Sequence, residues 1–355
     1  MSACNSTSDT PEVPTVDYKI QFAPSKITFD ASESSQNISV TANKNWTVTS
    51  SQSWCTLAIS SGFAGESSLK VNVQINRLNT ARTAVLTFKI AEKTSELLVM
   101  QNAGAGENYV PAGYSLVWNE EFNEARQANG KPALPNTTRW SYETGASGWG
   151  NNEIQNYIAA YSGTDTCAII TNGTLKIIAK KRASEVISIR MNSINSWLYG
   201  YFEARLKVPG GKGTWPAFWM LPKNFVSWPL DGEIDIMEYV GYRPNVVQSS
   251  VHTYSYNHSI GTEKTATRQI ANAETEFHVY AVEWTADKIT GFVDGVSYFS
   301  FANDKTNNKN TWPFNAPFYL KLNLAWGGNW GGSQGIDETK LPATYEIDYV
   351  RVYQK

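Results

Sequence analysis

Short runs of alternating hydrophobic and polar residues recur along most of the 355-residue chain, and clusters of Ser, Asn, Gly and Thr separate them. Alternation with a period of two places one set of side chains on each face of a strand, so each run predicts a β-strand. Strands are expected at 36–42, 46–49, 69–75, 84–90, 96–101, 174–180, 200–208, 277–284, 318–324 and 345–353. Beyond a turn or two near 271–276, no segment keeps a helical period. The pattern therefore predicts an all-β protein.

The spacing of these runs divides the chain into four segments. Residues 1–17 are polar, contain proline and lack periodicity, which predicts a disordered tether. In residues 18–103 the turn clusters recur about every ten residues, as in a small immunoglobulin-like β-sandwich. Residues 104–112 are rich in Gly, Pro and Ala and are expected to be a linker. Residues 113–355 are expected to form a larger sandwich of two sheets.

Composition excludes several classes of function. A net charge of -2 provides no basic patch for nucleic acid and no polybasic segment for a membrane surface. No apolar run approaches the length of a transmembrane helix. The three histidines and three cysteines are scattered, which excludes a zinc cluster with the usual spacings.

The three cysteines lie far apart, and their odd number argues against a disulfide framework. Cys55 and Cys167 are expected to be small buried hydrophobic residues. Cys4 lies in Ser-Ala-Cys-Asn before a Ser/Thr/Pro-rich run, which resembles the cleavage site of a bacterial lipoprotein. The resemblance implies a lipid anchor on Cys4 as the only membrane contact. It also implies an extracytoplasmic location, at the outer-membrane surface or in the periplasm. The alternative is a cysteine without a role in an unstructured tail.

Residues 231–241, Asp-Gly-Glu-Ile-Asp-Ile-Met-Glu-Tyr-Val-Gly, read as a turn followed by a strand with three acids. Glu233 and Asp235 project from one face of an extended strand, whereas Glu238 has the opposite parity. One extra residue absorbed as a β-bulge near 236–237 would return Glu238 to the face of Glu233. Neighbouring carboxyl groups raise each other's pKa, and chemistry that needs one ionised and one protonated acid uses such a group. The alternative is a solvated edge strand.

Residues 213–222, Gly-Thr-Trp-Pro-Ala-Phe-Trp-Met-Leu-Pro, and the acidic stretch together resemble glycoside hydrolase family 16, in particular its laminarinase and mixed-linkage β-glucanase branch. Further matching stretches are 116–123, 149–155, 199–205 and 293–295. The resemblance implies a concanavalin-like β-jelly-roll with an open cleft. It also implies that Glu233 is the nucleophile, Glu238 the general acid/base, and Asp235 the hydrogen-bond partner of the nucleophile. Retaining chemistry places the two catalytic carboxyl groups about 5–5.5 Å apart.

The same resemblance and the aromatic content of this segment indicate residues that bind sugar, because pyranose C–H faces stack on aromatic rings. Trp326 and Trp330 lie in a glycine-rich stretch that is expected to be an exposed loop, and each tryptophan could instead belong to the core. Glu203 and Arg205 share a strand face and could instead form an ion pair, and His252 could instead be structural. The expected substrate-binding residues are Asn152, Glu153, Arg190, Glu203, Arg205, Trp215, Trp219, Trp228, His252, Trp326 and Trp330.

The chemistry needs no cofactor, but the resemblance implies a structural calcium ion held by Asp348 and by backbone oxygens near Glu121 and Gly173. His278, inside an alternating strand, is expected to be structural.

Residues 18–103 resemble the BACON module, an immunoglobulin-like domain of carbohydrate-active proteins. The matching marks are Asn45-Trp46-Thr47-Val48, Ser53-Trp54, 76–77, 80–82 and 99–102. Trp46 and Trp54 are expected in the core, with sugar stacking as the alternative. A spacer role is the default expectation.

These marks predict a monomeric, endo-acting, retaining β-glucanase whose partner is a β-1,3- or mixed-linkage β-1,3/1,4-glucan. Agarases and carrageenases share the bulged spacing, so a galactanase is an alternative inside the family. A transglycosylase and a non-catalytic glycan-binding protein are the others.

Overall fold

The computed structural model describes residues 17–52, 54–76, 81–104, 109–127, 129–160 and 166–355. The chain forms two compact units, Met1–Asn108 and Tyr109–Lys355, and the division falls inside the expected linker. Most of the expected tether, with Cys4, lies outside the described residues. Within the described residues, no helix is both long enough and apolar enough to cross a membrane.

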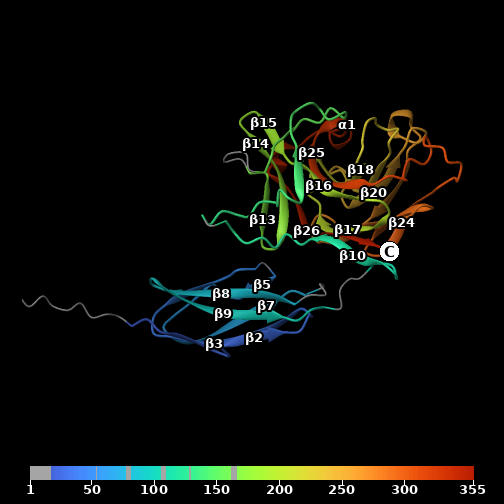
Figure 1. Cartoon of the computed structure of the whole chain (residues 1–355). Helices are drawn as coiled ribbons and strands as arrows, with labels where there is room; N and C mark the ends of the chain where they lie inside the picture. Colours follow the sequence, from blue (N-terminus) through green and yellow to red (C-terminus); the bar gives the residue numbers. More distant parts are fainter. Residues whose placement is uncertain (1–16, 53, 77–80, 105–108, 128, 161–165) are drawn as a thin grey trace, which may run out of the picture. The chain divides into compact units, whose positions relative to one another are not determined.

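The first unit is a sandwich of two sheets (Figure 1). Its strands are β1 Ile20–Ala23, β2 Lys26–Phe29, β3 Ser34–Ala42, β4 Trp46–Ser50, β5 Cys55–Leu57, β6 Ser61–Gly62, β7 Gly65–Val73, β8 Arg82–Ile90 and β9 Lys93–Gln101. One sheet has the order β1-β3-β7-β5 and the other β2-β9-β8-β4-β6. Their alternating inner residues form one core, which contains Trp46, Trp54 and Cys55. The two tryptophans are thus core residues, as predicted.

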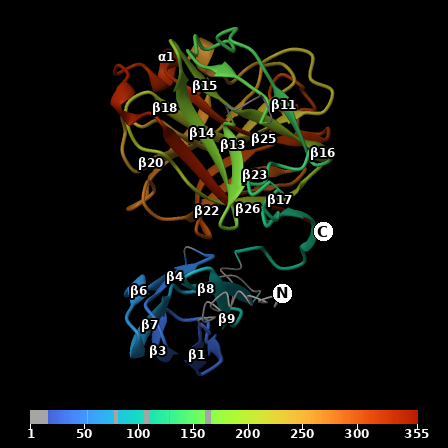
Figure 2. The ribbon, with the colours of Figure 1, turned by 90° about the vertical axis from the view of Figure 1, so that its left-hand side faces the viewer.

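The second unit is also built from two sheets, which can be followed in Figure 1 and, turned by 90°, in Figure 2. The ten-stranded sheet contains β10 Ser115–Glu120, β12 Asn156–Tyr157, β13 Ala168–Thr171, β14 Thr174–Arg182, β15 Glu185–Ser188, β17 Gly200–Lys207, β22 His278–Trp284, β23 Lys288–Val293, β24 Val296–Ala302 and β26 Ala343–Gln354. The seven-stranded sheet contains β11 Trp140–Glu143, β16 Arg190–Trp197, β18 Thr214–Pro222, β19 Glu233–Tyr239, β20 Val246–His252, β21 Lys264–Gln269 and β25 Phe318–Trp326. Its strand order is β11-β16-β25-β18-β19-β20-β21.

Helical structure in the described residues is confined to short turns: α1 Gly328–Gly331 and the 3₁₀ turns His258–Ile260 and Glu338–Lys340. Residues 271–276 form turns rather than a helix. The all-β prediction is therefore confirmed.

The core of the second unit lies between its two sheets and fixes which side chains face outward. Alternate residues of each strand enter this core, for example Leu320, Leu322 and Leu324 of β25 and Ile234 of β19. The intervening residues project from the opposite face, which in the seven-stranded sheet carries the candidate site. We call this outward face of the seven-stranded sheet the site face.

Candidate active site

The three acids of β19 share the site face because the strand contains a bulge. Asp235 pairs with Trp219 of β18 and Met237 pairs with Phe218, so Ile236 is the extra residue between them. The register toward β20 shifts in the same place. Ile236 and Met237 are both fully buried in the core, and Glu238 consequently returns to the face of Glu233. The predicted bulge is confirmed.

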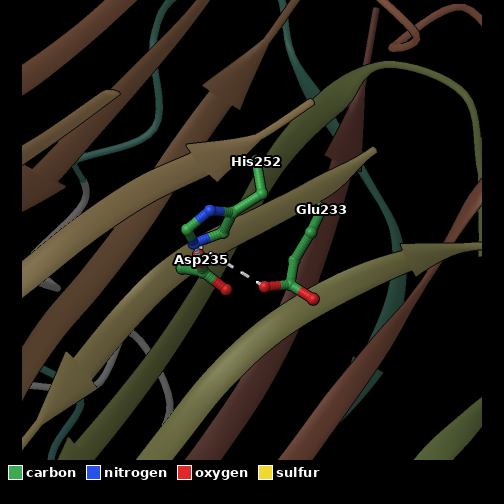
Figure 3. A group of neighbouring side chains, drawn as sticks. All are labelled: Glu233, Asp235 and His252. Atoms are coloured by element: carbon green, nitrogen blue, oxygen red, sulfur yellow. Dashed lines mark ion pairs between the residues drawn. The ribbon is translucent and has the colours of Figure 1, made fainter. Parts of the chain in front are cut away.

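His252 lies opposite Glu233 on β20 and contacts two of the acids. Its Nε2 is 3.3 Å from Oδ2 of Asp235 and 3.8 Å from Oε1 of Glu233. Figure 3 shows the three side chains pointing toward one another, with the ion pairs dashed. The predicted position of His252 at the site is confirmed, whereas its contact with sugar stays a prediction.

Burial raises the pKa of each acid to about 8, so protons are retained in this group near neutral pH. The charge of Asp235 raises the pKa values of Glu233 and Glu238 further, while that of His252 opposes the rise in both. Because His252 lies against Glu233 and Asp235, negative charge is best placed on that pair. Glu238 is then the acid that keeps its proton. The donor atoms of Glu233, Asp235 and His252 also lie within 4.8 Å of one another, a spacing that could hold a cation. A resident cation would occupy the carboxylate needed for attack, so we assign these residues to acid–base chemistry.

Trp215 contacts the other end of the acid group. Its indole Nε1 donates a hydrogen bond to Oε1 of Glu238 over 3.1 Å, which lowers the pKa of Glu238 against the effect of burial. Trp330, from α1, packs edge-on against the Trp215 ring with centroids 5.4 Å apart. Both tryptophans are half-buried, so each leaves ring surface open beside the acid.

Arg190 and Lys321 place two positive charges on the site face around Trp219. The Arg190 guanidinium lies 4.8 Å from the centroid of Trp219 and 4.8 Å from that of Trp149, and the Lys321 ammonium lies 5.0 Å from Trp219. Both cations pair with Glu143. Burial would raise the pKa of Glu143, but Lys321 and Arg190 together lower it to about 2. Trp219 is only 9% exposed, so its predicted role as an open sugar platform has little free surface.

Glu153 joins the site face through a chain of hydrogen bonds. Its Oε2 accepts from Tyr157 Oη (3.0 Å), and Asn323 Nδ2 donates to Tyr157 Oη (3.2 Å). Oδ1 of Asn323 in turn accepts the indole Nε1 hydrogen of Trp219 (2.7 Å). Glu153 is itself buried, so these bonds fix the orientation of Trp219.

Asn152, next to Glu153, is exposed and donates from Nδ2 to Oδ1 of Asn329 in α1 (2.9 Å). This bond links the loop after β11 to the turn that carries Trp330. Asn152 therefore lies on the rim beside Trp330 rather than among the acids.

Trp228 stands over His252, with ring centroids 5.8 Å apart. It is half-buried in the segment between β18 and β19. The same ring stacks on His258 at 4.9 Å, a residue that sequence patterns did not indicate.

The prediction that Trp326 is exposed is wrong. Trp326 ends β25 and is fully buried in the core, where it continues the alternation of Leu320, Leu322 and Leu324. Gly213 makes this possible, because a side-chain carbon there would lie 3.1 Å from the Trp326 ring.

Glu203 and Arg205 lie on β17 in the other sheet, and the structure does not bring them to the acids. Phe202 and Ala204 enter the core, so Glu203 and Arg205 point away from it and from the site face. They do not pair with each other either: Tyr353 Oη donates to Glu203 (3.2 Å), and Arg205 pairs with Asp348 (2.7 Å). The alternation placed these two residues on one face correctly but could not identify the sheet.

The side chains expected near calcium are engaged by arginines. Asp348 pairs with Arg205, and Glu121 pairs with Arg351 at 2.8 Å. Among the described residues, the grouping of possible metal ligands includes neither carboxylate. Gly173 occupies a left-handed turn (φ 72°) between β13 and β14. The side chains do not fit a calcium ion without releasing Arg205, and calcium binding stays a prediction.

His278 pairs with Asp294 at 2.7 Å in the ten-stranded sheet, which agrees with its expected structural role. Cys167 is buried as expected.

Sequence reasoning missed Glu143, Trp149, Lys321, Asn323 and His258. Lys321 offered a signal, because it is a charged residue inside the apolar run 318–324. His258 offered none, because it lies in a loop without periodicity.

Comparisons with known proteins agree with this geometry. Residues 155–351 match the family model described as glycosyl hydrolases family 16, and residues 19–104 match that of a viral BACON domain. A β-glucanase of Rhodothermus marinus is 42% identical over 254 residues, covering 68% of this chain and 85% of that protein. The laminarinase structure from Rhodothermus marinus covers 68% of this chain and 97% of its own, at a TM-score of 0.63 and 42% identity. The structure of SCLam, described as a non-specific endo-β-1,3(4)-glucanase from the same family, covers 69% and 93% at a TM-score of 0.64 and 41% identity.

Proposed function

The chain belongs to glycosyl hydrolases family 16, and we propose that its second unit is an endo-acting, retaining glycosidase that cleaves β-1,3-glucan and mixed-linkage β-1,3/1,4-glucan. The observation that carries the proposal is the bulge at Ile236, which gathers Glu233, Asp235 and Glu238 on one face. The names of the similar proteins, laminarinase and endo-β-1,3(4)-glucanase, support the choice of glucan.

The contacts of the acids support a division of labour between them. Glu233, beside His252, is the nucleophile that attacks the anomeric carbon of the sugar. Glu238, which keeps its proton, donates it to the departing glycosidic oxygen. A covalent glycosyl–enzyme forms, and water then releases the sugar with Glu238 as the base. Asp235 shares His252 with Glu233 and so holds the nucleophile in place.

The direct test compares the parent with Glu233→Gln on laminarin. The amide is nearly isosteric with the carboxyl group but cannot attack carbon, so we expect sugar release to fall at least ~10³-fold. Glu203→Gln is the matched control, because Glu203 is an equally buried acid of the same unit away from the site. Equal release by Glu233→Gln and the parent would end the enzyme proposal and favour the glycan-binding alternative.

Substrate class and stereochemistry need separate measurements. Products from laminarin, lichenan, barley glucan and agarose distinguish the β-glucanase from an agarase- or carrageenase-type galactanase. Nuclear magnetic resonance of the first product distinguishes retention from inversion, and inversion would refute the double displacement. Added oligosaccharide acceptors that compete with water would indicate a transglycosylase.

We also propose that the protein is a monomer held outside the cytoplasm by a lipid on Cys4. The Ser-Ala-Cys-Asn stretch and a polysaccharide substrate too large to cross a membrane support this location. Mass spectrometry of the N-terminal peptide from native cells tests it, and an unmodified Cys4 would refute the anchor.

A further inference from the structure

His258 lies in the loop after β20, and its ring contacts two rings of the site. The His258 ring stacks on Trp228 with centroids 4.9 Å apart and a tilt of 37°. It meets the His252 ring edge-on, at 5.2 Å and 85°. His252 is the residue that contacts Glu233 and Asp235. His258 is therefore one ring away from the nucleophile, and it remains solvent-exposed.

The loop that carries His258 is anchored by Asn257, which is only 3% exposed. Its side-chain Nδ2 donates to the backbone carbonyls of Thr253 and Tyr254, at 3.1 Å each. Its own carbonyl accepts from the backbone N–H of Thr262 at 3.1 Å. Both flanks of His258 are thus tied to one buried amide, and the ring is held in place although the loop lies at the surface.

The segment that carries Trp228 is anchored independently, by Asp231. One oxygen of Asp231 accepts from the backbone N–H groups of Val226 and Ser227 at 2.8 Å each, and the other oxygen pairs with Lys309 at 2.6 Å. Trp228 and His258 therefore come from two separately fixed segments and meet beside the end of β19 where Glu233 begins. Fixed aromatic surface at the edge of an active site is typical of a sugar subsite, because it costs little entropy to bind against.

We propose that Trp228 and His258 form one wall of the sugar subsite beside Glu233, and that the exposed ring nitrogen of His258 hydrogen-bonds a hydroxyl group of the bound glucose residue. This inference rests on the proposed glucanase function and adds a residue to it. Pyranose rings offer apolar C–H faces and hydroxyl edges, which match an indole face flanked by an imidazole edge. Burial, and next the neighbouring charge of His252, lower the pKa of His258. Its neutral ring can then donate from one nitrogen and accept at the other.

Two substitutions separate the parts of this wall. His258→Phe keeps a ring against Trp228 but removes both nitrogens, whereas His258→Ala removes the ring as well. The loss of one neutral hydrogen bond predicts a rise in KM of roughly 2- to 10-fold for His258→Phe, with kcat close to that of the parent. His258→Ala is expected to raise KM further, because Trp228 also loses its support. His278→Phe is the matched control, since His278 lies in the other sheet against Asp294, and it should leave KM unchanged.

Kinetics on a defined laminari-oligosaccharide should be paired with calorimetric binding of the same oligosaccharide to each variant in a Glu233→Gln background. Kd should rise with KM, and the melting temperature should stay near the parent value because His258 is exposed. Unchanged KM and Kd in both His258 variants would overturn the inference, as would losses confined to kcat or to the melting temperature. A parent that does not cleave laminarin would instead refute the proposed function. An active parent with unaffected His258 variants would refute the wall alone.

Discussion

The hydrogen bond from Trp215 to Glu238 gives the most direct handle on the acid–base step. The bond joins the indole Nε1 to Oε1 of Glu238 over 3.1 Å, and it favours the ionised form of this carboxyl group. Trp215→Phe keeps an aromatic ring in place but removes the donor. The protonated form of Glu238 is then favoured, so its pKa, already about 8 through burial, should rise.

The size of the shift follows from the geometry of the bond. A hydrogen bond to a charged group contributes about 1.5–3 kcal/mol, and 1.36 kcal/mol corresponds to one pKa unit. Because Trp215 and Glu238 are both half-buried, solvent screens part of this energy, and we expect a rise of about 0.5–1 unit. The general acid must be protonated to act, so a higher pKa keeps the enzyme active at higher pH. One unit above the parent's alkaline midpoint, Trp215→Phe should retain a fraction of its own maximum about two- to fivefold larger than the parent does.

The assay is the pH profile of kcat/KM on soluble laminarin, with each variant scaled to its own maximum because the smaller ring also changes sugar stacking. Trp330→Phe is the control: Trp330 packs against the Trp215 ring, so the change disturbs that packing and leaves the Trp215 donor intact. The reasoning fails if the alkaline limb of Trp215→Phe coincides with that of the parent, or if Trp330→Phe moves it equally.

Two further predictions concern the outward face of the ten-stranded sheet. Burial raises the pKa of Glu203 to about 7, above the value of about 4.3 in an unfolded chain, so this carboxyl group favours the fold at low pH and destabilises it as pH rises from about 4.3 through 7. Glu203→Gln should therefore raise the melting temperature at pH 8, by a free energy on the order of 3 kcal/mol, and change it little at pH 4; an equal effect at both pH values would contradict the shift. Asp348→Asn should lower the melting temperature in EDTA as well as in calcium, because the ion pair with Arg205 needs no metal. A loss seen only with calcium would instead support the predicted metal site.

Much of the catalytic strand could be predicted because its geometry is local. Alternation along β19 sets the faces of Glu233 and Asp235, and the wrong parity of Glu238 leaves a bulge as the way to join them. The burial of Trp326 was also readable, since it continues the even-numbered core positions of β25, but the glycines after it suggested a loop and hid the pattern. Residue identity at Gly213, more than one hundred positions earlier, makes room for that ring.

The positions of Glu203 and Arg205 could not be obtained in this way. Alternation states that two residues share a face, but a sandwich has two outward faces, and strand order decides which one they occupy. The neighbours of β17 are β22 and β26, which lie far from it in the sequence, so no local pattern identifies the sheet. The same limit applies to His258, whose contact with Trp228 joins two loops.

The protonation states of the acids depend on these non-local contacts. Gathering three carboxyl groups on one strand face costs free energy, because burial and mutual repulsion oppose their charges. The groups that offset this cost, His252 on β20 and Trp215 on β18, reach opposite ends of the acid row from opposite sides of β19. One offers a positive charge to the nucleophile, and the other a neutral donor to Glu238. The motif alone therefore locates the acids, but the order of strands around β19 decides which carboxyl group attacks and which one carries the proton.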